Sequence, residues 1–130
     1  MPLAENDGLR ILVVDDNEDW VTSMAMMLTM MGHVAHTAHD GEAAVVAAES
    51  FRPHVVLLDI GIPKLNGYEV ARRIREQEWG ESIYLIAVTG NVRDEDRRRS
   101  AGVGMNLHMI KPVESAALES LLLALRTGSR

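Results

Sequence analysis

The sequence predicts an α/β fold with a five-stranded parallel sheet and helices on both of its faces. Strand-like and helix-like segments alternate five times, which is typical of parallel strands joined by crossover helices. The most apolar strand candidates are unbroken runs, as expected of strands that are buried on both faces. The expected strands are residues 10–14, 33–38, 55–58, 83–88 and 107–110. The expected helices are residues 18–31, 42–50, 68–77, 93–100 and 115–126.

The first strand and helix are clearly patterned. Residues 10–14 form a short β-branched apolar run, and Asn17 after it supplies the chemistry of a helix N-cap. Gly32 marks the end of the helix expected over residues 18–31. The apolar residues of this helix recur close to every 3.6 positions, at Trp20, Met24, Met27, Leu28 and Met31.

The second and third strands differ in their patterning. Residues 33–38 alternate weakly between apolar and polar, so we expect this strand nearer an edge of the sheet. Residues 42–50 form a short Ala/Val helix that is broken at Pro53, before the fully apolar strand 55–58. The helix over residues 68–77 directs three apolar side chains inward, those of Val70, Ala71 and Ile74.

The last two strands follow the same plan. The apolar strand 83–88 leads into a glycine turn, and the helix 93–100 carries acids first and bases last, which suits the helix dipole. Strand 107–110 precedes the final helix, residues 115–126. That helix has leucines at helical spacing, at positions 118, 121, 122 and 125.

Length and composition fit one domain with one core. The chain has 130 residues, of which 47% are hydrophobic and 25% are charged, as in ordinary globular proteins. We expect the folded domain to span residues 10–126, between a polar N-terminal tail (1–9) and a short C-terminal tail (127–130).

Composition also excludes several classes of function. The chain has no cysteine, which excludes disulfides, thiol catalysis and cysteine-ligated zinc. Its formal net charge of −6 argues against non-specific binding of nucleic acid, which needs a positive surface. No apolar stretch approaches the ~20 residues that cross a bilayer, and the first residues show no signal-peptide pattern. We therefore expect a cytoplasmic protein without membrane insertion.

Polar and charged residues follow four of the expected strands. Asp15 and Asp16 end the first strand, Asp59 the third, Thr89 the fourth and Lys111 the fifth. Because the carboxyl ends of parallel strands share one edge of the sheet, we expect these side chains to lie close together. Three neighbouring carboxylates repel one another unless a divalent cation sits among them, and oxygen ligands suit Mg²⁺.

This set of residues suits the binding and transfer of a phosphoryl group. Asp59 is the candidate nucleophile, which would form an acyl phosphate. Lys111 can neutralise a phosphoryl oxygen, the Thr89 hydroxyl can hydrogen-bond it, and the Gly61 carbonyl can complete the metal shell. Alone, Asp15 and Asp16 would be explained as helix-capping residues, Thr89 as a strand-end hydroxyl and Lys111 as a surface lysine. Only the combination favours the functional interpretation.

With these residues in this order, residues 10–126 resemble the receiver domain of two-component response regulators. The resemblance is carried by Asp15, Asp16, Asp59, Thr89, Lys111 and Pro112, with Pro63 and Gly67 in the matching loop. It implies a doubly wound (βα)5, flavodoxin-like fold with strand order 2-1-3-4-5. It also implies that a sensor histidine kinase or a histidine phosphotransfer protein donates the phosphoryl group.

The resemblance implies a role for each site residue. Asp59 would be the phosphoacceptor, and the two preceding acids and the Gly61 carbonyl would join it in binding Mg²⁺, for which Mn²⁺ can substitute. Lys111 would contact the phosphoryl group, and its bond to Pro112 would be cis. Thr89 would be the switch hydroxyl, acting on the face formed by the fourth helix, the fifth strand and the fifth helix.

Two positions depart from the family pattern. The switch position on the fifth strand, often Tyr or Phe, is His108, and Gly90 replaces the usual Ala after Thr89. The segment around Asp59 is similar to receivers appended to hybrid histidine kinases, which often carry His at the switch position. We therefore expect such a receiver, or a single-domain response regulator of that lineage. The domain itself would not be a turnover enzyme, whereas a hybrid parent would be a protein histidine kinase.

Two other functions stay open at this point. One is a pseudo-receiver, an interaction module that never gains phosphate, although the intact acids argue against it. The other is an aspartyl-phosphate hydrolase of the haloacid dehalogenase type, which needs a second Asp two residues after the nucleophile, where this chain has Gly61. A homodimer that forms on phosphorylation is also open.

Overall fold

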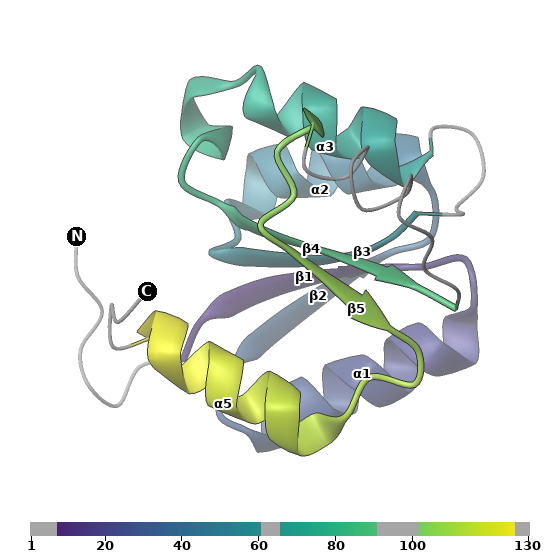
Figure 1. Ribbon diagram of the computed structural model, residues 1–130, viewed down its shortest axis with the longest axis vertical. Coiled ribbons are helices and arrows are strands. Elements are labelled where there is room, and N and C mark those ends of the chain that lie inside the picture. The colour runs from purple at the N-terminus through teal and green to yellow at the C-terminus, as the bar shows by residue number, and fades with distance from the viewer. Residues whose placement is uncertain (1–7, 61–65, 91–101, 127–130) are drawn as a thin grey trace.

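The computed structural model describes residues 8–60, 66–90 and 102–126, and these form one parallel sheet between two layers of helices (Figure 1). The strand order is β2-β1-β3-β4-β5, and every neighbouring pair is parallel. The fold class and strand order expected from the sequence are confirmed. The strands are β1 (Arg10–Val14), β2 (Val34–Ala38), β3 (Val55–Asp59), β4 (Tyr84–Thr89) and β5 (Leu107–Ile110).

Four of the five expected helices fall within the described residues, and the expected helix over residues 93–100 lies outside them. The described elements are α1 (Glu18–Met30), α2 (Gly41–Phe51), α3 (Gly67–Arg75), the 3₁₀ turn η1 (Glu78–Gly80) and α5 (Ser115–Arg126). The third helix was expected to end at residue 77 but ends two residues earlier, shortly before the 3₁₀ turn η1. None of the helices in these ranges is long and apolar enough to span a bilayer.

The core has two halves, one on each face of the sheet. Successive residues of a strand point to opposite faces, so β1 sends Leu12 and Val14 to one half and Ile11 and Val13 to the other. Helices α2 and α3 cover the first half, and α1 and α5 cover the second (Figure 1). Burial on both faces explains why the central strands are apolar without alternation.

Side-chain caps place the helices that follow β1, β2 and β3. Asn17, Asp40 and Asn66 each accept a hydrogen bond from the backbone N–H three residues later, at 2.8–3.1 Å. These bonds satisfy N–H groups that the first turn of a helix leaves unpaired. Each of these helices therefore begins at a defined distance from the end of the strand before it.

The edge of the sheet and the start of the domain refine two expectations. Strand β2 lies at one edge, as its weak alternation predicted, with Val34 53% exposed. Leu9, which we placed in the N-terminal tail, is only 2% exposed, and its N–H donates to His33 Nδ1. Packing therefore begins before residue 10, because Leu9 fills the core under β1.

Candidate functional site

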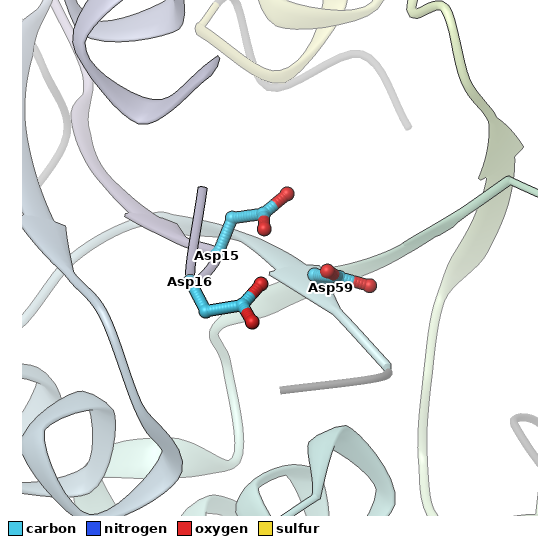
Figure 2. A group of neighbouring side chains, drawn as sticks. All are labelled: Asp15, Asp16 and Asp59. Carbon is cyan, nitrogen blue, oxygen red and sulfur yellow. The ribbon is translucent and has the colours of Figure 1, made fainter. Parts of the chain in front are cut away.

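Three carboxylates converge at the carboxyl ends of β1 and β3 (Figure 2). One oxygen from each of Asp15, Asp16 and Asp59 lies within 4.8 Å of the other two. Asp15 is buried, Asp59 is half-buried and Asp16 is exposed, so the cluster opens to solvent on one side. The convergence predicted from the strand ends is present.

Strand pairing places these acids. Val14 of β1 pairs with Leu58 of β3, and the next residue of each strand segment is an acid. The Asp15 N–H donates to the Ala38 carbonyl of β2 at 3.2 Å, which fixes the backbone at that point. The Asn17 N–H donates to Asp15 Oδ1 at 3.0 Å, which orients the Asp15 carboxylate.

Lys111 reaches the same cluster from the end of β5. Its Nζ lies 2.5 Å from Asp15 Oδ2 and 3.8 Å from Asp59 Oδ2. Its backbone N–H donates to the Thr89 carbonyl at 2.8 Å, which holds the end of β5 against β4. The Lys111–Pro112 peptide bond is cis, in agreement with what the resemblance implies.

The electrostatics of Asp15 follow from these contacts. Burial alone would raise the pKa of the Asp15 carboxyl, because the charged form loses hydration. The hydrogen bonds from Lys111 and from the Asn17 backbone outweigh burial, so the pKa of Asp15 lies below its usual value. Asp15 is therefore a carboxylate at neutral pH, despite being almost fully buried.

The loop after β3 is tied to the start of α3 by a close backbone approach. The Gly67 N–H donates to the Ile60 carbonyl at 3.0 Å, and the Ile60 N–H donates to the Val88 carbonyl at 3.3 Å. A Cβ added to Gly67 would lie 2.7 Å from Ile60 Cα and 2.9 Å from the Asp59 carbonyl oxygen. Glycine at position 67 therefore allows α3 to begin directly beside Asp59.

The remaining predicted residues are placed as follows. Thr89 is the half-buried last residue of β4. Asp59 pairs with Val88, the residue before Thr89, so Thr89 lies at the same rim as the acids. His108 is half-buried on β5 and pairs with Ala87, two residues below that rim. Gly61, the predicted carbonyl ligand, lies outside the described residues.

Trp20 is a site residue that the sequence analysis did not identify. We assigned it only to the apolar stripe of the first helix, yet its ring lies beside Lys111, with Nζ 4.7 Å from the ring centroid. The available signal was its spacing, five residues after Asp15 and in the first turn of the helix that follows the acids. From the first turn of α1, the Trp20 ring extends to Lys111 at the carboxyl rim of the sheet.

The donor set fits a hard divalent cation. Three carboxylates supply oxygen ligands close to one another, and one of them is open to solvent, from which water ligands can enter. Mg²⁺ prefers such oxygens and keeps several of its waters, so a cluster of this kind need not supply a full shell.

Comparison with known proteins agrees with this geometry. The sequence model of the response regulator receiver domain matches residues 11–123, nearly the whole described part of the chain. This chain belongs to the receiver domain family. Receiver domains are phosphoacceptor domains of two-component systems rather than turnover enzymes, so the match does not support the hydrolase alternative.

The relatives include receivers of histidine kinases. The chain is 37% identical to the receiver domain of sensor histidine kinase PA1611 from Pseudomonas aeruginosa, with a TM-score of 0.83 over 94% of this chain and 99% of that one. That structure holds a magnesium ion in its active-site cleft. The chain is also 35% identical to Probable histidine kinase 2 of Oryza sativa subsp. indica, over 83% of this chain and 12% of that protein.

Other relatives differ in length. Sensor histidine kinase RcsC of Escherichia coli is 32% identical over 92% of this chain, which spans only 12% of that kinase. An uncharacterized 14.6 kDa protein of Leptolyngbya boryana is 33% identical over 92% of this chain and 89% of that protein. The chain thus matches a small part of the kinases and nearly the whole of a short protein.

Proposed function

We propose that Asp59 is the phosphoacceptor of this receiver domain and that Asp15, Asp16 and Asp59 bind Mg²⁺. The observation that carries this proposal is the cluster itself, three carboxylates within 4.8 Å with Lys111 bridging two of them. Of the three acids, Asp59 combines partial burial with a place at the tip of a central strand. Asp15 is already engaged by Lys111 and by the Asn17 N–H, which makes it a poorer nucleophile than Asp59, and we assign it to the metal site.

The chemistry is an in-line transfer onto a carboxylate oxygen. Bound Mg²⁺ would neutralise charge on the phosphoryl oxygens. An Asp59 oxygen forms a new bond to phosphorus while the bond from phosphorus to the donor imidazole nitrogen breaks, and that nitrogen takes a proton from water. Lys111 stabilises the negative charge on the transferred group, because its ammonium is 3.8 Å from Asp59 Oδ2.

The response to phosphorylation would begin at the end of β4. Thr89 lies at the rim beside the phosphoacceptor strand, where its hydroxyl can turn to a phosphoryl oxygen. We infer that His108, half-buried on the neighbouring β5, takes the place of the aromatic switch residue. A change at Thr89 is transmitted to β5 through the hydrogen bond from the Lys111 N–H to the Thr89 carbonyl.

The donor is a phosphohistidine on a sensor histidine kinase or on a histidine phosphotransfer protein. The similarity to receivers of histidine kinases supports the hybrid-kinase lineage, in which the parent protein would have kinase activity. A cytoplasmic location, the use of Mn²⁺ in place of Mg²⁺, the Gly61 carbonyl ligand, and dimerisation on phosphorylation stay predictions.

Intact mass after incubation with acetyl phosphate and MgCl₂ tests the proposed acceptor. We expect one added phosphoryl group on the wild type and none on Asp59→Asn, and loss of the adduct when Mg²⁺ is chelated. Asp19→Asn is the matched control, because Asp19 is an exposed acid in the first turn of α1 and should leave the adduct unchanged. An adduct that survives in Asp59→Asn would place the acceptor elsewhere.

An absent adduct on the wild type has two explanations that a second experiment separates. Beryllofluoride with Mg²⁺ mimics a phosphorylated carboxylate without hydrolysing, so chemical shift changes around Asp59 on its addition would indicate a short-lived acyl phosphate. No change would favour the pseudo-receiver, a module that does not accept phosphate.

A further inference from the structure

The ring of Trp20 and the carboxylate of Asp15 hold the Lys111 ammonium between them. Nζ is 4.7 Å from the Trp20 ring centroid and 2.5 Å from Asp15 Oδ2, but 3.8 Å from Asp59 Oδ2. An ammonium over an aromatic face is attracted by the negative charge of the ring surface. Both contacts therefore favour the position of Lys111 on Asp15 over one nearer the phosphoacceptor.

Trp20 is anchored well enough to act as a fixed support. Its backbone N–H donates to the Asn17 side chain at 3.1 Å, which caps α1, and its ring packs against the core half beneath α1 and α5. Trp20 is thus held in the first turn of α1, and its ring is not a free surface group.

The position of Lys111 conflicts with metal binding at Asp15. Asp15 Oδ1 accepts the Asn17 N–H, and Oδ2 accepts the Lys111 ammonium, so both oxygens already have donors. A divalent cation that uses Asp15 must compete with the ammonium for Oδ2. Any group that stabilises Lys111 on Asp15 therefore weakens the affinity of the cluster for the ion.

We propose that Trp20 is a positioning residue that holds Lys111 on Asp15 and thereby lowers the Mg²⁺ affinity of the acidic cluster. The inference rests on the proposed function, because it assigns Asp15 to the metal site. It makes Lys111 an internal counter-ion of the metal-free domain, released toward Asp59 when the ion takes over Asp15. Trp20 then sets how readily that exchange occurs.

The other tryptophan is a matched control. Trp79 lies in η1, before β4, and therefore at the opposite rim of the parallel sheet. Its ring also faces a cation, with Arg52 Cζ 5.0 Å from the ring centroid, and it packs against the other core half. Trp79→Leu therefore removes the same kind of contact at the rim opposite the acidic cluster.

The dissociation constant of Mg²⁺ can be measured from the amide chemical shifts of residues 15–17 during a titration with MgCl₂. We expect Trp20→Leu to lower this constant about two- to fivefold, the range that a partly exposed cation–π contact gives, and Trp20→Phe to lower it less. Trp79→Leu should leave it unchanged. In a Lys111→Met background, Trp20→Leu should have no effect, because the group through which Trp20 acts is gone.

The double-mutant cycle decides the inference. An unchanged or raised constant in Trp20→Leu, or an equal decrease with and without Lys111, would show that Trp20 does not act through Lys111. If the wild type itself fails to bind Mg²⁺, the proposed function fails together with the inference. If the wild type binds Mg²⁺ and the cycle shows no coupling, only the inference is wrong.

Discussion

The two rims of the sheet use polar residues in opposite ways. At the amino rim, Arg75 donates to the backbone carbonyls of residues 80, 81, 83 and 104 and to Asn106 Oδ1, at 2.7–3.3 Å. At the carboxyl rim, Asp15, Asp16 and Asp59 lie close to one another, and Asp15 also accepts the Asn17 N–H and the Lys111 ammonium. One rim joins segments of the chain, and the other gathers like charges.

The difference shows where this fold uses polar groups for stability and where it uses them for function. Charged groups that hydrogen-bond to backbone partners stabilise the folded chain. Removing such a group would leave its backbone partners without a hydrogen bond. Neighbouring carboxylates destabilise it until a cation binds. Substitutions at the two rims should therefore change stability in opposite directions, which the following predictions test.

The largest effect should come from the amino rim. Arg75→Met should lower the free energy of unfolding by about 2–4 kcal/mol, because several carbonyls lose their donor at once. The connection before β5 should loosen as well, since Arg75 bonds to both the Gly104 carbonyl and the Asn106 side chain. Urea unfolding followed by circular dichroism measures the loss.

Arg73→Met is the matched control for Arg75, because Arg73 is an exposed arginine on the same helix. Its unfolding free energy should stay within about 0.5 kcal/mol of the wild type, as for most surface substitutions. Equal effects of the two substitutions would contradict the role that we assign to Arg75.

The contrast between the rims also describes what the sequence could predict. The acids at positions 15, 16 and 59 were predictable because they follow apolar runs, and parallel strands bring their carboxyl ends to one edge. The Arg75 bonds were not predictable, because most of their acceptors are backbone carbonyls, which every residue has. The Trp20–Lys111 contact was missed for another reason. A tryptophan in the apolar stripe of a helix is already explained by packing against the core, so its position indicated no second role.

A smaller effect of opposite sign is expected at the carboxyl rim. Without metal, Asp59→Asn should raise the free energy of unfolding by about 1 kcal/mol, because it removes one of three like charges. Lys111 keeps its closer partner, Asp15, so the substitution does not isolate the ammonium. Thermal unfolding in the presence of a chelator measures the change.

Magnesium should reverse that order of stability. The wild type gains stability as the ion binds only the folded state, while Asp59→Asn gains less because it has lost a ligand. The melting curves of the two proteins should therefore cross as MgCl₂ is added, and Asp19→Asn should follow the wild type throughout. A variant that is less stable than the wild type even without metal would contradict the repulsion argument.

The smallest effect concerns two histidines at the amino rim, which flank the start of β1. His33 Nδ1 accepts the Leu9 N–H and His54 Nδ1 accepts the Arg10 N–H, both at 2.9 Å. Burial lowers the pKa of each ring, and the positive charges of Arg126 and Arg10 add to the effect at His33 and His54 respectively. The folded state therefore holds both rings neutral at neutral pH.

The sign of the pH dependence follows from these lowered pKa values. Below the unfolded value of about 6.5, the unfolded chain binds protons that folded His33 and His54 exclude, so stability falls as the pH falls. Above the unfolded pKa, the stability that the two neutral histidines contribute is fully present. His33→Asn and His54→Asn keep an acceptor near the position of Nδ1 but cannot titrate, so they should lose less stability than the wild type between pH 7.5 and 5.5. The exposed His39→Asn is the control, and a wild-type slope in the double variant would show that neither ring is the sensor.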